Sequence, residues 1–485
     1  MGVLSHLEPQ EVFNYFEEIC AIPHASYKES KISDYCAAFA KKHGLECYQD
    51  EWKNIVIIKE AAKGYEKEPT LILQGHLDMV CEKDPGSDFD FETDGLRLIV
   101  DGDHITADGT TLGGDDGIAI AYMLAVLASE TIAHPRLEAV FTVSEETGME
   151  GAAGIDVSML WGKRLLNLDS EEEGFFLAGC AGGASVICRL PVNRIAASGE
   201  LVKITVSGLA GGHSGMDINR GRANANILMG RVLQKLTEHT SCFLACLEGG
   251  GRDNVIPGNC MAALYLDPAR LEAVKQIIAD MRRIFAGEYA VTDKNIRLCL
   301  ECGTQEDLSQ LPAMLDAEST ARIVWLVNTL PNGVQAMSAQ VEGMVETSLN
   351  LGVMRLESEQ AVFRYSVRSS IERAKEALLA KLRVLTEETG GTSEVTGIYP
   401  AWEYKKDSVL RKKLVSVYEQ MYGSKPVIQV IHAGLECGLL AEKIPGLDCV
   451  SIGPDLIDIH TTNEKLCISS AKRVWEFLLQ VLQTK

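Results

Sequence analysis

Short segments that carry histidine and acidic side chains recur along this chain. Together they contain two histidines and six acidic residues: His76 and Asp78, Asp115 and Asp116, Glu145 and Glu146, Asp169, and His460. Imidazole and carboxylate groups are ligands that zinc accepts in proteins. Two metal ions held by such ligands polarise a carbonyl and generate hydroxide at neutral pH, while a carboxylate left over can move protons. The inventory predicts a two-metal hydrolytic site.

Several of these segments follow a run that is typical of a buried strand. His76 comes after the apolar residues 71–73, and Asp169 comes after the largely apolar residues 165–168. Polar side chains at the carboxyl ends of neighbouring strands form the usual site of an α/β sheet. Residues two apart on a strand face the same way, so Asp78 can support the imidazole of His76.

Each segment taken alone has a simpler interpretation. The two aspartates at 115 and 116 precede a helical run and could cap it, although they would repel phosphate. Glu145 and Glu146 could form a solvated acidic turn. On the extended backbone expected here their side chains would instead diverge, so that one could ligate metal while the other acts as general base. A lone histidine such as His460 is more often structural. Five such features at strand ends of one domain favour the metal site.

The expected elements place these side chains in an α/β domain. Helical segments alternate with expected strands in the first part of the chain: helices at 9–21 and 29–43, strands at 54–59, 70–73 and 137–143. The alternation returns after residue 402 and brings His460. The fold class expected for the catalytic part is therefore α/β with a mixed sheet.

A change of pattern predicts a domain inserted at 184–398. A strand, a helix, a strand pair and a second helix occur twice there, from 201 to 285 and again from 296 to 387. The repeat predicts an α+β lid built from two similar halves. Because the expected ligands lie on both sides of it, residues 1–183 and 399–485 would together form one catalytic domain.

Composition and charge disfavour several classes of partner. The chain has 485 residues, 46% of them hydrophobic and 24% charged, with a formal net charge of −22. That charge argues against nucleic acid and anionic membranes as partners. The longest apolar run, 118–128, is too short to span a membrane, and the N-terminus lacks the pattern of a secretory signal. We therefore expect a cytoplasmic protein whose fourteen cysteines are reduced.

The order His-x-Asp, Asp, Glu-Glu, Asp and a distant His resembles the di-zinc aminoacylase, carboxypeptidase and dipeptidase superfamily. Longer strings resemble its aminoacyl-histidine dipeptidase branch, also called cytosolic non-specific dipeptidase: those at 113–117, 167–174, 208–215 and 431–438. Many superfamily members carry lysine after the second aspartate, where this chain has Gly117. That departure agrees with the dipeptidase branch and counts against the deacylases.

The resemblance implies five protein ligands for two zinc ions. His76 and Asp169 would bind one ion. Glu146 and His460 would bind the other, and Asp115 would bridge the two. Manganese and cobalt fit similar ligands and could replace zinc. The resemblance also implies a cis peptide bond between Asp115 and the next aspartate.

The resemblance also implies catalytic roles outside the ligand set. Glu145 would serve first as general base and then as general acid, while Asp78 would orient His76. His213, in a glycine-rich turn of the middle segment, would stabilise the oxyanion. In relatives with a single lid the equivalent histidine comes from a neighbouring subunit. A doubled lid permits a monomer without forbidding a homodimer.

Three further residues are expected to contact the substrate. Arg368 ends an expected strand, and its planar guanidinium suits bidentate binding of a carboxylate. Asn254 and Glu436 are additional candidates. The expected activity is hydrolysis of dipeptides, either of the Xaa-His type or with broad specificity. Deacylation of N-acyl amino acids at the same site is the alternative, and a non-catalytic binding module with a degraded metal site is the third.

Overall fold

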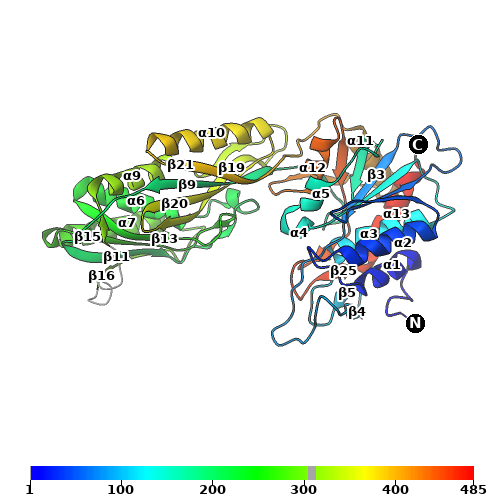
Figure 1. Ribbon diagram of the computed structural model, residues 1–485, viewed down its shortest axis with the longest axis horizontal. Helices are drawn as coiled ribbons and strands as arrows, with labels where there is room; N and C mark the ends of the chain where they lie inside the picture. The colour runs from blue at the N-terminus through cyan, green and yellow to red at the C-terminus, as the bar shows by residue number, and fades with distance from the viewer. Residues whose placement is uncertain (1, 304–312) are drawn as a thin grey trace. The chain divides into compact units, whose positions relative to one another are not determined.

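The chain folds into two compact units, each with its own hydrophobic core (Figure 1). The computed structural model describes residues 2–303 and 313–485. The first unit contains Met1–Cys180, Tyr404–Val430 and Leu435–Lys485. The second unit contains Ala181–Glu403 and the short stretch Ile431–Gly434. The second unit is therefore inserted into the sequence of the first.

The first unit is built on an eight-stranded mixed sheet. Its strand order is β1 (Glu46–Gln49), β2 (Ile55–Lys59), β6 (Leu137–Thr142), β3 (Leu71–His76), β7 (Arg164–Asn167), β23 (Asp448–Ser451), β8 (Phe175–Cys180) and β22 (Val427–Ile431). The four central strands β6, β3, β7 and β23 run parallel to one another. Every residue of β3, β6 and β23 is buried, as expected for parallel strands covered on both faces.

Helices pack against this sheet and contribute to its core. They are α1 (Gln10–Cys20), α2 (Ser30–Lys42), α3 (Gly114–Ala128), α11 (Val409–Tyr422), α12 (Glu436–Lys443) and α13 (Ile468–Gln483). Helix α3 packs against β3 and α1, whereas α11 packs against β23 and α13. A small sheet follows the order β24 (Leu456–Ile457), β25 (Lys465–Cys467), β5 (His104–Ala107) and β4 (Leu98–Asp101). Of the described helices, none is long and apolar enough to cross a membrane.

The second unit is an α+β domain built on a nine-stranded sheet. The order is β16 (Arg297–Cys302), β11 (Glu200–Ser207), β15 (Cys260–Leu266), β13 (Cys242–Gly249), β19 (Val345–Leu356), β20 (Gln360–Ser369), β9 (Gly182–Pro191) and β21 (Thr392–Tyr399), with β18 (Gly333–Met337) beside β19. Four helices share its core: α6 (Ala225–His239), α7 (Leu271–Glu288), α9 (Ala317–Thr329) and α10 (Glu372–Glu388).

The sheet consists of two similar halves that meet where β13 pairs with β19. The expectation that residues 296–302 open the second half was wrong. That segment forms β16, which pairs with β11 at the outer edge of the first half. The strand corresponding to β11 in the second half is β9, which comes before β11 in the chain and pairs with β20. Sequence order hid this exchange, because strand pairing depends on long-range contacts.

Candidate metal centre

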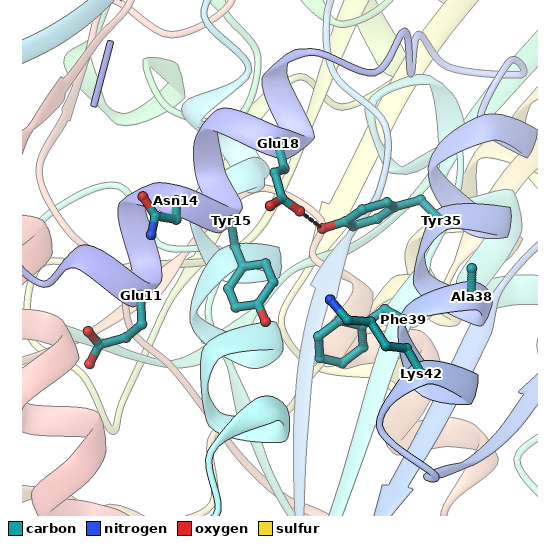
Figure 2. A pocket seen from close by; sticks show the side chains of 8 residues that line it. All are labelled: Glu11, Asn14, Tyr15, Glu18, Tyr35, Ala38, Phe39 and Lys42. Carbon is teal, nitrogen blue, oxygen red and sulfur yellow. Dashed lines mark hydrogen bonds between the residues drawn. The ribbon is translucent and has the colours of Figure 1, made fainter. Parts of the chain in front are cut away.

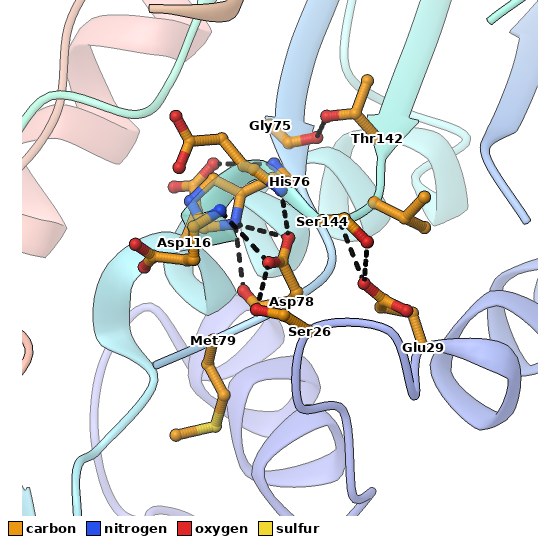
Figure 3. Close-up of polar contacts among 12 residues, drawn as sticks. Ser26, Glu29, Gly75, His76, Asp78, Met79, Asp116, Thr142 and Ser144 are labelled. Atoms are coloured by element: carbon orange, nitrogen blue, oxygen red, sulfur yellow. Dashed lines mark hydrogen bonds and ion pairs between the residues drawn. The ribbon is translucent and has the colours of Figure 1, made fainter. Parts of the chain in front are cut away.

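His76 ends strand β3 with its side chain almost completely buried. Its Nδ1 lies 2.9 Å from the backbone oxygen of Asp78 (Figure 3). A carbonyl oxygen only accepts hydrogen bonds, so the proton of the neutral ring lies on Nδ1 and the lone pair on Nε2. Nε2 lies 3.1 Å from Oδ1 of Asp115 and 3.5 Å from Oδ1 of Asp169. The lone pair therefore points at the acidic cluster.

Asp115 lies between the two predicted histidine ligands, with one carboxylate oxygen facing each. Oδ1 faces Nε2 of His76, and Oδ2 lies 3.2 Å from Nε2 of His460. The same nitrogen of His460 lies 3.0 Å from Oε1 of Glu146. The peptide bond between Asp115 and Asp116 is cis, as the resemblance implied. The two oxygens of Asp115 are thus directed at two separate groups of ligands.

The loop that holds Asp115 is itself held by a buried carboxylate, that of Glu464. Glu464 is 2% exposed and accepts hydrogen bonds from four successive backbone N–H groups at the start of α3. Its Oε2 accepts from Leu112 at 2.7 Å and Gly113 at 3.1 Å, and its Oε1 accepts from Gly114 at 2.8 Å and Asp115 at 3.3 Å. Sequence reasoning missed this residue, because an acidic residue four positions after His460 resembles any polar loop residue.

Asp78 connects His76 to the two adjacent glutamates. Its Oδ1 accepts the backbone N–H of Glu145 at 2.9 Å, and its Oδ2 accepts the N–H of Glu146 at 3.2 Å and the hydroxyl of Ser26 at 2.7 Å. We expected the glutamates on extended backbone, but they begin the four-residue helix α4 (Glu145–Gly148). The carboxylate of Asp78 takes the free N–H groups of that helix, which explains the difference.

Three groups of described residues could each hold a metal ion. Within each group, the possible ligand atoms lie within 4.8 Å of one another. The groups are His76 with Asp116 and Asp169, His76 with Glu145 and Glu146, and Asp115 with Glu146 and His460. All five predicted ligands occur in them, together with Asp116 and Glu145, to which the resemblance assigned no ligand role. Oδ2 of Asp116 accepts the backbone N–H of His76 at 3.1 Å. A Cβ at residue 75 would lie 2.5 Å from that oxygen and 2.9 Å from Cβ of Ala119, which favours glycine there.

The electrostatics of the cluster fit a cation. Burial raises the pKa of Asp169 to about 8 and holds the pKa values of Asp116 and Glu145 well above their usual range; the charges of neighbouring carboxylates act in the same direction, and the charge of His76 acts against it. Hydrogen bonds to Asp115 and Glu146 raise the pKa of His460 to about 10. Buried carboxylates in such excess need positive charge, and divalent metal ions supply it. The donor set of imidazole and carboxylate suits zinc and similar ions.

Glu436 lies in the first unit and is completely buried at the start of α12. Its Oε2 accepts hydrogen bonds from Nε2 of Gln74 and from the hydroxyl of Thr142, both at 2.6 Å. Its Oε1 has no hydrogen-bond partner among residues 2–303 and 313–485. Burial raises the pKa of Glu436 to about 7. The group is therefore a candidate proton donor or acceptor beside strands β3 and β6.

The other predicted substrate residues belong to the second unit. His213 lies in β12 (Gly212–His213), which pairs with β14 (Val255–Ile256). Its Nδ1 accepts the backbone N–H groups of Gly215 at 3.3 Å and Met216 at 3.1 Å. The proton of the neutral ring must therefore lie on Nε2, which makes Nε2 a hydrogen-bond donor.

The loop that carries Asn254 is fixed from both sides. The backbone oxygen of Asn254 accepts the N–H of Ser214 at 2.9 Å, which joins the loop to the turn of His213. Nδ2 of Asn350 donates to the backbone oxygens of Asp253 at 2.8 Å and Val255 at 2.9 Å. The backbone of the loop is thus held by contacts with both halves of the sheet, while the side chain of Asn254 is exposed.

Arg368 lies on β20 and is 8% exposed. Its Nη1 donates to the hydroxyl of Tyr399 at 2.9 Å. The side chain lines a cavity of about 340 Å³, which Arg252, Arg364 and Asn254 also line. Three arginines around one cavity favour an anionic ligand.

A cavity of about 420 Å³ on the first unit lies away from the predicted site residues. It is lined by side chains of α1 and α2: Glu11, Asn14, Tyr15, Glu18, Tyr35, Ala38, Phe39 and Lys42 (Figure 2). The hydroxyl of Tyr35 donates to Oε2 of Glu18 at 2.6 Å across it. None of the candidate ligands lines this cavity.

The fold and the ligand cluster together define a metal-dependent hydrolase. Residues 204–293 match the peptidase dimerisation domain of the M20 family. The chain is 37% identical over 485 residues to the cytosol non-specific dipeptidase of Escherichia coli (strain K12), covering 100% of this chain and 99% of that protein. The chain belongs to the M20 metallopeptidase family, and it is a peptide hydrolase.

Solved structures agree with this assignment. The crystal structure of aminoacylhistidine dipeptidase from Vibrio alginolyticus has a TM-score of 0.93 and 36% identity, covering 99% of this chain and 97% of that chain. The structure of aminopeptidase PepT from Bacillus cereus ATCC 10987 has a TM-score of 0.56 and 17% identity, with 98% of each chain covered. The second likeness extends to the fold alone.

Proposed function

We propose that this protein hydrolyses dipeptides with two zinc ions and a glutamate general base. The observation that carries the proposal is the position of Asp115, whose two oxygens face His76, 39 positions away in the sequence, and His460, 345 positions away. The dipeptidase names of the relatives similar along the whole chain favour a peptide over an N-acyl amino acid as substrate. One of these relatives is named as non-specific and the other for aminoacyl-histidine substrates, so the proposal covers dipeptides of broad sequence as well as the Xaa-His type.

The proposed ligands divide between two ions. His76 and Asp169 would hold one ion, Glu146 and His460 the other, and Asp115 would bridge them. When bound, the ions would polarise the scissile carbonyl and lower the pKa of a water molecule. Manganese or cobalt would fit the same donor atoms.

Glu145 is proposed to move the proton. The carboxylate of Asp78 accepts the backbone N–H of Glu145, which fixes the backbone from which that side chain extends. The side chain of its neighbour Glu146 faces His460. Glu145 would take a proton from the attacking water and then give it to the leaving amine. Asp78 would fix the ring of His76 through the contact of 3.4 Å between Oδ1 and Nδ1.

The second unit, which we propose acts as a lid, would supply the remaining groups. The donor at Nε2 of His213 suits an oxyanion, because the acceptor at Nδ1 is already occupied by backbone N–H groups. Arg368 would bind the C-terminal carboxylate of the dipeptide, and Asn254 is an additional candidate for contact with the substrate. Glu436, from the first unit, is the other candidate for contact with the substrate.

The proposed setting is a homodimer in the cytoplasm. The match of residues 204–293 to a peptidase dimerisation domain supports self-association through the second unit. The cytosolic name of the relative from Escherichia coli supports the location. Small peptides are the proposed partners, with neither nucleic acid nor membrane involved.

The test is an assay of the full-length protein after metal removal and reloading with zinc. A panel of dipeptides and their N-acetylated counterparts would be compared with and without zinc. We expect zinc-dependent release of amino acids from the free dipeptides and little from the acetylated ones. Preferential cleavage of the acetylated compounds would establish the deacylase alternative, and metal binding without any hydrolysis would favour a binding module.

A further inference from the structure

Besides His213, the second unit has another imidazole, that of His432, beside the proposed substrate residues. His432 belongs to Ile431–Gly434, which groups with the second unit although its sequence neighbours group with the first. Its side chain is 6% exposed. A Cβ at Gly215 would lie 2.4 Å from the backbone oxygen of His432, so the turn that carries His213 packs directly on this stretch.

The sheet places Arg368 next to His432. Register partners cross it in one row: Tyr399 of β21, Gly183 of β9, Arg368 of β20 and Ser348 of β19. Partners in a row share one face of the sheet, so the Cβ atoms of the direct partners Arg368 and Ser348 are expected about 5 Å apart. The hydroxyl of Ser348 lies 2.7 Å from Nε2 of His432. His432 therefore continues the row beyond Ser348, the register partner of Arg368.

Two buried nitrogen atoms of this row lack partners. Nε of Arg368 and Nδ1 of His432 make no hydrogen bond to any part of the chain that the structure describes. Buried polar atoms are usually paired, so two orphans on neighbouring side chains need a common explanation. An arginine Nε always carries a proton, and it can only donate. The missing partner is therefore an acceptor.

His432 can also donate a hydrogen bond to that acceptor. Burial, together with the charge of Arg368, lowers the pKa of His432 to about 4, so the ring is neutral at pH 7. A neutral ring has one N–H, and the hydroxyl of Ser348 can rotate to donate to Nε2. The ring proton is then on Nδ1. A carboxylate has two oxygens, which can accept from both side chains at once.

We propose that His432 is a specificity-determining residue that donates from Nδ1 to the same C-terminal carboxylate that Arg368 binds. The inference rests on the proposed dipeptidase function and adds a residue to it. An uncharged amide at that position would place an N–H group against these donors. His432 would therefore favour substrates that end in a free carboxylate.

The test compares His432→Leu with wild type, using the full-length zinc-loaded enzyme, alanyl-alanine and its C-terminal amide. Loss of a hydrogen bond to a charged group should raise KM for the free dipeptide by roughly ten-fold or more. We expect kcat to change by less than about three-fold and kcat/KM for the amide to stay near the wild-type value. His239→Leu, at an exposed histidine of the same unit, is the matched control and should change neither.

A second pair of variants separates binding from folding. An asparagine amide can occupy the place of Nδ1, whereas a glutamine amide reaches the place of Nε2. His432→Asn should therefore keep a lower KM than His432→Gln, and the reverse order would overturn the inference even if His432→Leu folds poorly. If the wild type prefers the free carboxylate but His432→Leu leaves KM unchanged, the role of His432 is overturned and the proposed function stands. A wild type that cleaves no dipeptide would overturn the proposed function, and this inference with it.

Discussion

Replacing Glu464 by glutamine should weaken both the fold around α3 and the binding of metal. The carboxylate accepts four backbone N–H groups, two on each oxygen, at 2.7 to 3.3 Å. Glutamine keeps one oxygen and replaces the other by an amide nitrogen, which cannot accept. Two N–H groups in a buried loop would then lose their acceptor: either those of Leu112 and Gly113 or those of Gly114 and Asp115.

The expected cost follows from those two contacts. A hydrogen bond to a charged group contributes about 1.5 kcal/mol or more, so the loss of two should lower the free energy of unfolding by about 3 kcal/mol. Groups that orient a metal ligand typically change metal affinity by roughly ten- to a hundred-fold when removed. Urea unfolding of the metal-free protein measures the first effect, and competition with a coloured zinc chelator measures the second.

The control is Glu476→Gln, at an exposed position of α13, which should leave both quantities unchanged. Glu464→Asp keeps the charge on a shorter side chain and should fall between wild type and Glu464→Gln. If Glu464→Gln unfolds at the wild-type urea concentration and binds zinc with wild-type affinity, Glu464 does not hold the loop of Asp115.

Three other substitutions test the proposed roles. Glu145→Gln should lower kcat by roughly two to four orders of magnitude while two zinc ions remain bound, since a general base is not a ligand; near-normal turnover would remove Glu145 from the mechanism. Asp115→Ala should lose metal at both positions in elemental analysis, because one carboxylate serves both ions, and retention of two zinc ions would exclude bridging. Arg368→Ala should lower kcat/KM for a dipeptide by roughly ten- to a hundred-fold and leave its C-terminal amide almost unaffected, since only the former has the charge that arginine binds. Equal losses on both compounds would assign the carboxylate to another residue.

Much of the first unit could be predicted from local pattern. Apolar runs such as residues 71–73 form buried parallel strands, because a chain of such residues is stable only when covered on both faces. Polar side chains that follow such runs must then gather at one edge of the sheet, which is why the types of the ligands could be predicted from the sequence. The orientation of Glu145 could not be predicted, because the start of α4 is bound by the carboxylate of Asp78, which follows a different strand.

The second unit shows where pattern stops being sufficient. The repeat of strands and helices was visible, but the assignment of residues 296–302 to the second half failed. A strand can pair with any edge that its length and faces allow, and local sequence does not say which edge is near. Nor does the sequence indicate that Ile431–Gly434 belongs with this unit and places His432 beside Ser348.

The sequence by itself determined the chemistry available to this protein: imidazoles and carboxylates after buried strands, a duplicated insertion, and the family to which these belong. Tertiary structure alone decided which atoms meet. His460 reaches Asp115 across 345 positions, and Glu464 reaches the start of α3 across about as many. Residue type and spacing act over a few positions along the chain, whereas the direction of a carboxylate oxygen depends on how distant segments pack.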